Sequence, residues 1–208
     1  MRLLLLLPIG LFAMWCWAGC SPGPQHVDEI PEHTIFRIKS EILSEERVVA
    51  VSLPTSYADG TSSFPVLYMP DGGIKEDFPH VANTINDLVA RKKMSPVILV
   101  GVENTDRKRD MTSPTEVAED RKVGPVVGGS ANFRAFFRDE LMPQVERDYR
   151  ASGEAGIIGE SLAGYFIVDC FLEEPAVFDR YVALSPSLWW NDHAHVRQAE
   201  ESLKRNEG

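Results

Sequence analysis

The sequence predicts an α/β fold with a mostly parallel sheet covered by helices on both faces. Short apolar segments of strand length alternate with longer amphipathic segments of helical period. Several of the apolar segments are continuous runs that end in turn residues, which is the pattern of strands buried on both faces of a parallel sheet. A chain of 208 residues with 44% apolar content is also long enough for one globular domain with its own core.

Six strands and four helices are expected from these periodicities. The first two strands contain β-branched residues in partial alternation and are joined directly, so they should form an antiparallel edge. The expected strands are 34–43, 47–54, 64–70, 95–103, 155–160 and 180–187, and the expected helices are 77–94, 131–150, 162–175 and 193–206. Residues 104–130 form a connection that is too long to be a simple linker, which favours a functional loop.

The N-terminal segment predicts export. Residues 1–19 carry one positive charge and an apolar run, the layout of a secretory signal peptide. The last residues before Cys20 resemble a bacterial lipobox, although Trp17 stands where leucine is usual, so we expect Cys20 to be acylated. An ordinary cleaved signal or a simple membrane anchor remains an alternative. Residues 20–33 read as a tether, and the protein is expected in a bacterial cell envelope, membrane-anchored or periplasmic.

Charge and cysteine content exclude several classes. The net charge of −10 argues against nucleic acid as a partner, because such proteins need a basic face to displace counterions. If Cys20 carries lipid, Cys170 remains as a lone thiol in an apolar helix and is expected to pack in the core. The sequence shows no spacing typical of a metal site, and it predicts no cofactor.

The segment Gly-Glu-Ser-Leu-Ala, centred on Ser161, predicts a nucleophile elbow. In such a turn a serine lies between a strand and a helix, and the residues two before and two after it must be small. Gly159 and Ala163 meet that requirement, and a strand and a helix are expected on the correct sides. The alternative is a closely packed strand-to-helix turn with a capping serine.

An elbow requires an oxyanion hole. One donor is expected at the backbone N–H of Leu162, where the new helix begins. The other is expected in the loop after strand 64–70, where Gly72 and Gly73 would allow close approach of a substrate. That loop can equally be an ordinary turn.

Five segments in order, at 64–73, 97–114, 136–150, 157–166 and 178–192, resemble the esterase branch of the α/β-hydrolases. That branch includes enterobactin-type siderophore esterases, S-formylglutathione hydrolases and mycolyltransferases. The resemblance implies a domain over 34–208 that acts on a small-molecule carboxylic ester.

The resemblance also implies roles for individual residues. Ser161 matches the nucleophile, and Leu162 and Gly73 match the oxyanion donors. Arg107 and Arg109 lie in a polar loop at the site mouth and are candidates to bind an anionic substrate group, with ion pairs that fix the loop as the alternative. Trp190 is a candidate substrate wall, with packing equally open.

The family's acid and histidine have no match in this chain, because two further strands would have to follow residue 187. His193 and His195 come too early in chain order and are interpreted as surface or capping residues. We therefore expect a fragment of a serine esterase that lacks its general base. The alternative is a non-catalytic surface lipoprotein that keeps the hydrolase scaffold to bind a ligand.

Overall fold

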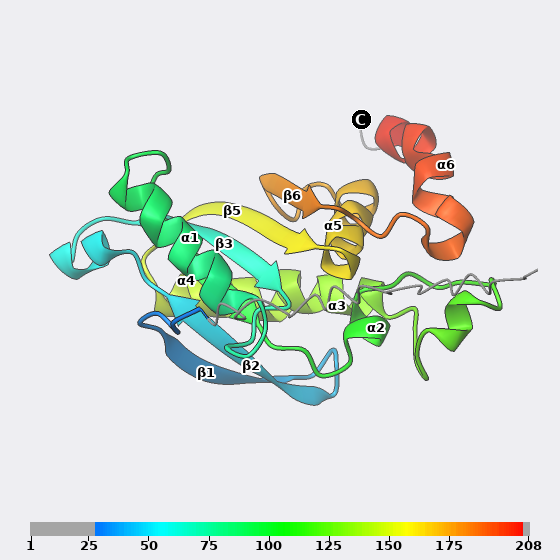
Figure 1. The fold of residues 1–208 in the computed structure, drawn as a ribbon, viewed down its shortest axis with the longest axis horizontal. Coiled ribbons are helices and arrows are strands. Elements are labelled where there is room, and N and C mark those ends of the chain that lie inside the picture. The colour runs from blue at the N-terminus through cyan, green and yellow to red at the C-terminus, as the bar shows by residue number, and fades with distance from the viewer. Residues whose placement is uncertain (1–27, 206–208) are drawn as a thin grey trace, which may run out of the picture.

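The structure, a computed structural model, describes residues 28–205 (Figure 1). The predicted signal peptide, Cys20 and the first part of the tether lie outside the described residues. Within residues 28–205, no helix is both long and apolar enough to cross a membrane.

A six-stranded mixed sheet forms the centre of the domain, in the order β1-β2-β4-β3-β5-β6. β1 pairs antiparallel with β2, and β2 pairs antiparallel with β4, whereas β4, β3, β5 and β6 run parallel. The expected antiparallel edge on a parallel sheet is therefore confirmed. The strands are β1 (Thr34–Ser40), β2 (Glu45–Ser52), β3 (Phe64–Pro70), β4 (Ile98–Val102), β5 (Ala151–Glu160) and β6 (Arg180–Leu184).

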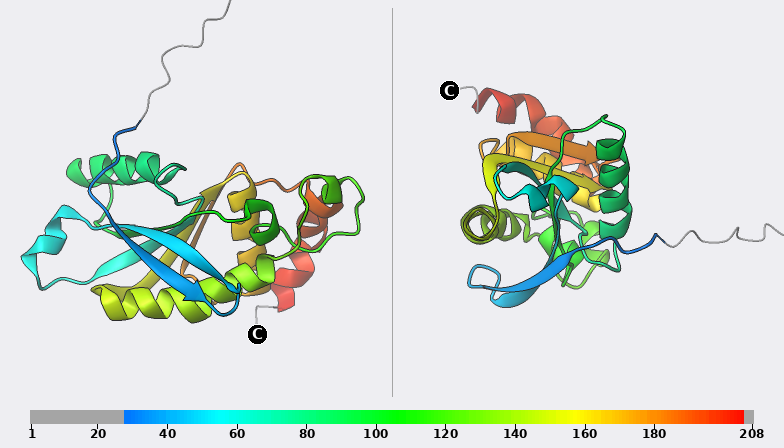
Figure 2. Two further views of the ribbon diagram at one scale, coloured as in Figure 1. Left: turned by 90° about the horizontal axis from the view of Figure 1, so that it is seen from below. Right: turned by 90° about the vertical axis from the view of Figure 1, so that its left-hand side faces the viewer.

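Helices cover both faces of the sheet, as Figure 2 shows most clearly. The helices are α1 (Phe78–Ala90), α2 (Arg107–Asp110), α3 (Ser130–Phe136), α4 (Met142–Asp148), α5 (Leu162–Glu173) and α6 (Trp190–Arg205), with short 3-10 turns at Thr55–Asp59 and Asp120–Lys122. A π-helical turn at Phe137–Leu141 joins α3 to α4 without a break, so the single helix expected over 131–150 is confirmed.

The strands divide the core into two clusters by the alternation of their side chains. On β3, Tyr68 packs into the larger cluster with the phenylalanines of α3 and α5, whereas the next residue, Met69, packs against α1 on the opposite face. Ile98 and Leu99 on β4 divide in the same way. This period of two is why a continuous apolar run folds as a strand buried on both faces.

The described end of the tether packs on α1. The amide of Asn83 donates a hydrogen bond to the carbonyl of Glu29 at 2.7 Å, and the His33 ring meets the edge of Phe78 with ring centroids 6.0 Å apart. Residues 28–33 are thus held against the domain where they enter it.

Candidate active site

Ser161 occupies the turn between β5 and α5, with its side chain exposed to solvent. Its backbone angles are φ 58° and ψ −114°, a region that non-glycine residues rarely adopt. The turn is also tight, because a Cβ added to Gly159 would lie 2.7 Å from the Cβ of Ala163. Both neighbours therefore have to be small for the strand to turn directly into the helix.

Backbone hydrogen bonds fasten this turn to the end of β6. The N–H of Ser161 donates to the carbonyl of Leu184 at 3.0 Å, and the N–H of Ser187 donates to the carbonyl of Ser161 at 3.0 Å. The Ser161 Oγ lies 3.4 Å from the Oγ of Ser187. In residues 28–205 the hydrogen-bonding neighbour of the nucleophile candidate is thus another hydroxyl and not an imidazole.

The loop after β3 is held close to β4. The N–H of Gly72 donates to the carbonyl of Val102 at 2.9 Å, and a Cβ on Gly72 would lie 2.3 Å from the Cα of Gly101, so only glycine fits there. The N–H of Gly73, the expected second oxyanion donor, donates to Glu76 Oε2 at 2.8 Å. Glu76 was not singled out from the sequence, although its place three residues after Gly73 is the spacing of a capping box.

Arg107 lies beside this loop and makes a two-pronged contact with Asp71. Its Nε and one terminal nitrogen each donate to a carboxylate oxygen of Asp71 at 2.7 Å, and 37% of the Arg107 side chain remains exposed. Hydrogen bonding to Asp71 raises the pKa of Arg107, so its charge is permanent. The guanidinium can still meet a substrate group, but only while it is shared with a carboxylate.

Acidic side chains dominate the surroundings of this loop. Burial and the charges of Asp71 and Glu160 together raise the pKa of Asp77 above its usual range. Glu160 is the residue directly before Ser161, so the negative potential extends to the nucleophile candidate.

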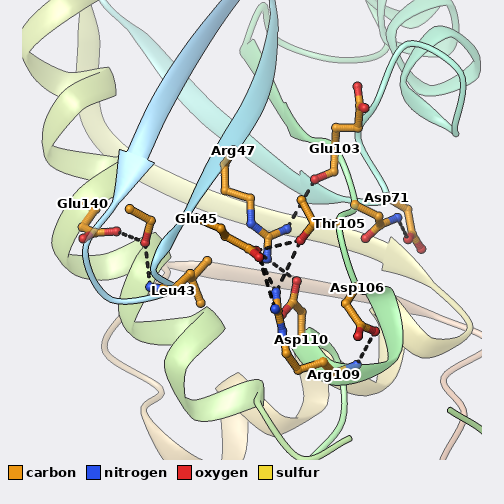
Figure 3. Close-up of polar contacts among 12 residues, drawn as sticks. Leu43, Glu45, Arg47, Asp71, Glu103, Thr105, Asp106, Arg109, Asp110 and Glu140 are labelled. Atoms are coloured by element: carbon orange, nitrogen blue, oxygen red, sulfur yellow. Dashed lines mark hydrogen bonds and ion pairs between the residues drawn. The ribbon is translucent and has the colours of Figure 1, made fainter. Parts of the chain in front are cut away.

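Arg109 is held by carboxylates on both sides. It donates to Glu45 at 2.7 Å and to Asp110 at 2.7 Å, and these bonds raise its pKa. Figure 3 shows the fully buried Arg47 pointing into the same group, where it pairs with Glu45 and Asp110. The expectation that Arg109 binds substrate is therefore not supported. The alternative interpretation, ion pairs that fix the loop, describes its contacts.

Trp190 does not form a substrate wall in this structure. Its side chain is fully buried, and the indole N–H donates to the carbonyl of Ser113 at 2.9 Å. The adjacent Trp189 is 49% exposed. The aromatic pair thus divides into one packing residue and one surface residue, a distinction that the sequence leaves open because both follow the same strand.

The interpretation of His195 as a surface or capping residue is wrong. Its ring is buried, stacks on Tyr165 with centroids 4.7 Å apart, and places Nε2 3.0 Å from Asp169 Oδ1. That approach is close enough for an ion pair, but its direction leaves Nε2 without a hydrogen bond. His193, in contrast, is exposed as expected.

His195 packs against the flank of α5, well away from the turn where that helix begins. Asp169 follows Ser161 by two helical turns, about 12 Å along the axis. The carboxylate of Asp169 is further held by Arg134 at 2.8 Å. His195 and Asp169 therefore form a structural contact between α6 and α5.

Two further expectations concern other parts of the chain. Cys170 is free, fully buried in the core and has a pKa raised well above its usual value by burial, so its role in packing is confirmed. No cluster of residues suited to holding a metal ion is found within residues 28–205.

Comparisons with known proteins place these features in a family. The model of the Esterase family, described as "Putative esterase", matches residues 40–207. Ferri-bacillibactin esterase BesA of Bacillus subtilis is 29% identical over an alignment of 189 residues that covers 81% of this chain and 63% of that relative. The siderophore enterobactin esterase of Emericella nidulans is 31% identical over an alignment of 122 residues that covers 51% of this chain and 40% of that relative. The chain thus spans less than two thirds of the length of each.

Solved structures show the same architecture. An IroE-like serine hydrolase from Shewanella oneidensis superposes with a TM-score of 0.73 at 27% identity, over 84% of this chain and 57% of the other. The BES protein from Bacillus cereus superposes with a TM-score of 0.74 at 25% identity, over 88% of this chain and 72% of the other. These likenesses and the sheet order show that the fold is that of an α/β-hydrolase.

Proposed function

Because the chain belongs to the Esterase family, we propose that it carries the nucleophile of a serine esterase that cleaves a carboxylic ester through an acyl-enzyme on Ser161. The observation that supports this most is the backbone of Ser161, with φ 58° between a buried parallel strand and a helix. Strain of this kind persists only where the surrounding structure imposes it, and it is concentrated at functional sites.

The proposed reaction has two steps. Ser161 Oγ attacks the ester carbon, the alcohol leaves, and the serine proton passes to a base and then to the leaving oxygen. Water then attacks the acyl-enzyme and releases the acid. Negative charge that develops on the carbonyl oxygen would be stabilised by the N–H of Leu162, at the positive end of α5, and by the N–H of Gly73.

The substrate class follows from the relatives. The two curated relatives are described by their names as esterases of siderophores, which are small molecules. We propose a small-molecule ester of that kind as the substrate. Arg107 is the candidate to meet a polar substrate group, since its guanidinium is partly exposed.

The general base and its acid are to be sought outside the described residues. The buried His195 is held on α5 by Tyr165 and Asp169, and the described hydroxyl neighbour of Ser161 is Ser187. A hydroxyl without a positioned base is a poor nucleophile at neutral pH. We therefore expect the 208-residue chain by itself to show little or no turnover.

Hydrolysis of p-nitrophenyl acetate tests the proposal, measured on the 208-residue chain and on the product of the complete reading frame. The complete product should hydrolyse the ester, and Ser161→Ala should reduce the rate to background. Ser187→Ala is the matched control, because it removes the neighbouring hydroxyl and should leave most of the activity. Equal rates for Ser161→Ala and the unmodified protein would contradict the mechanism and favour a scaffold that only binds a ligand.

We also propose that the protein is exported and anchored by lipid at Cys20. Support comes from residues 1–19 and from the lipobox-like sequence that precedes Cys20. Mass spectrometry of the mature protein from a bacterial envelope should find an acylated N-terminal cysteine. An unmodified N-terminus at another position would contradict the anchor.

A further inference from the structure

The carboxylate of Glu76 accepts a hydrogen bond from the N–H of Gly73, which the proposed reaction needs as an oxyanion donor. Glu76 Oε2 accepts from the N–H of Gly73 at 2.8 Å, and Glu76 Oε1 accepts from the side-chain amide of Asn104 at 2.8 Å. The N–H of Glu76 in turn donates to the carbonyl of Gly73 at 2.9 Å. Both carboxylate oxygens are thus engaged, and one of them lies where an anionic acceptor for Gly73 would lie.

An oxyanion and Glu76 cannot share this N–H favourably. Both are negative, and an oxygen bound to the same donor would lie within contact distance of the carboxylate. Asp71 and Glu160 already place negative charge near this loop, and together with burial they raise the pKa of Asp77. A further negative charge would therefore be disfavoured while Glu76 remains in place.

We propose that Glu76 gates the oxyanion hole: its carboxylate blocks the Gly73 N–H in the resting protein and has to leave before the transition state is stabilised there. Glu76 is then a positioning residue whose departure sets the rate. This inference rests on the proposed function of Ser161. If Glu76 is a gate, its removal should make Ser161 react faster. If Glu76 only supports the turn, its removal should make Ser161 react more slowly or leave its rate unchanged.

Asn104 provides the second anchor of the gate. Its side-chain amide donates to Asp71 Oδ1 at 2.6 Å as well as to Glu76, so it ties Glu76 to the carboxylate that holds Arg107. Without this amide, Glu76 would keep its bond to Gly73 but lose a second restraint on its other carboxylate oxygen. Its carboxylate should then leave the N–H more readily.

The test is the rate at which a fluorophosphonate labels Ser161 in the product of the complete reading frame, followed by intact mass. The reagent forms a phosphorus–oxygen bond to Ser161 as fluoride leaves and the serine proton passes to solvent. Its phosphoryl oxygen should accept from the same N–H donors as an ester oxyanion, those of Leu162 and Gly73. Glu76→Ala should be labelled on the order of tenfold faster than the unmodified protein. Glu76→Gln should show a smaller increase, because its neutral amide is a weaker acceptor than a carboxylate but can still occupy the Gly73 N–H. Asn104→Ala should also show a smaller increase than Glu76→Ala.

Thermal unfolding of the same variants separates the gate from a structural role. Glu76→Ala should lower the unfolding temperature, since the cap on Gly73 is lost, while labelling becomes faster. With p-nitrophenyl acetate, kcat should rise and KM should change little. Slower or unchanged labelling of both Glu76 variants would overturn the gate. Glu119→Ala is the control. Glu119 is exposed and pairs with Lys122, so this variant should change neither the labelling rate nor the unfolding temperature.

Exchange of the Gly73 amide proton, measured by NMR, keeps the two proposals distinguishable. If Ser161 in the unmodified protein does not react, the proposed function fails, but the amide can still be observed. Faster exchange in Glu76→Ala than in the unmodified protein supports the blocked donor. Equal exchange overturns it.

Discussion

Ser161 adopts backbone angles that glycine tolerates and that other residues rarely adopt. The φ of 58° is imposed by the turn between β5 and α5 and by the two backbone bonds to the end of β6. Such strain costs of the order of 1–3 kcal/mol, which the rest of the fold has to offset.

Replacement of Ser161 should reveal this strain. Ser161→Gly relieves it, whereas Ser161→Ala keeps a Cβ in the same conformation, so we expect the glycine variant to be more stable by about 1 kcal/mol. Urea unfolding of both variants measures the difference. At Ser187, which lies outside the positive-φ residues, the same pair should show the usual order with alanine more stable. An alanine variant that matches or exceeds glycine at 161 would show that the turn is relaxed.

Arg47 is a buried charge whose neutralisation depends on Asp110. The Arg47 side chain has no exposed surface and that of Asp110 is 1% exposed. Asp110→Asn removes a buried counter-charge, and we expect a loss of about 3 kcal/mol in the free energy of unfolding.

Denaturant unfolding checks that figure against a surface pair. Asp87 pairs with Arg91 four residues later, and both side chains are largely exposed. Asp87→Asn should therefore cost less than about 0.5 kcal/mol. Similar losses in the two variants would mean that the buried pair is no more important than a surface pair.

At the scale of elements, ion pairs attach the short helix α2 to β2. Glu45 on β2 accepts from Arg109 on α2 and pairs with Arg47 on its own strand. Burial by itself would raise the pKa of Glu45, but hydrogen bonds from Arg109 and Thr105 outweigh it and hold the pKa below its ordinary value of 4.5. This network positions the loop that also carries Arg107.

The pH dependence of stability follows from the depressed pKa. A carboxyl with a lower pKa in the folded state contributes stability above its unfolded value of about 4.5, and that contribution is lost as the pH falls through the folded pKa. Glu45→Gln should therefore be less stable than the unmodified protein by about 1 kcal/mol at pH 7, and this difference should be smaller at pH 3.

Urea midpoints at the two pH values measure this effect. Glu46→Gln is the matched control, because Glu46 is the next residue and pairs with Arg37 in solvent. It should show no comparable change with pH. A difference for Glu45→Gln that is as large at pH 3 as at pH 7 would assign its effect to packing.

The elements that the sequence predicts well are those set by local periodicity. Short segments carry the alternation on β3 and β4 and the small residues around Ser161. These features could therefore be predicted from the sequence. The burial of His195 could not, because it depends on Tyr165 and Asp169, which belong to another helix. The same holds for Trp190, which donates to the distant Ser113, and for Arg109, which pairs with the distant Glu45 as well as with its neighbour Asp110.

At the scale of the whole molecule, β6 is the outermost strand on its side of the sheet in residues 28–205. Its side chains alternate, and Val182 and Leu184 are 39% and 48% exposed. A strand edge with exposed apolar side chains is a template for pairing with another chain.

A lysine at this edge should reduce self-association. We expect Val182→Lys to lower light scattering of the concentrated 208-residue chain severalfold, because a charge on an edge strand opposes pairing. Val196→Lys, at an exposed apolar position on α6, is the control for charge alone. An equal decrease in both variants would assign the effect to net charge and not to the strand edge.

The general base is the part of the proposed site that neither the sequence nor residues 28–205 identify. The nucleophile and its helix follow from one local motif, but the base must come from another element, and only tertiary structure decides which. Glu76 lies between these cases, since its spacing from Gly73 signals a cap while its position over a proposed oxyanion donor follows only from the fold.

Because Ser161 is hydrogen-bonded to the end of β6, the nucleophile turn cannot be moved to another protein as a strand–turn–helix segment alone. The N–H of Ser161 donates to Leu184 at the end of β6, and its carbonyl accepts from Ser187 just after that strand as well as from Tyr165 in α5. A peptide that contained only β5, the turn and α5 would keep the bond from Tyr165 to the Ser161 carbonyl but would leave the Ser161 N–H to water, and the angle at Ser161 would relax. An engineer who moves this motif to another scaffold has to bring the neighbouring strand with it.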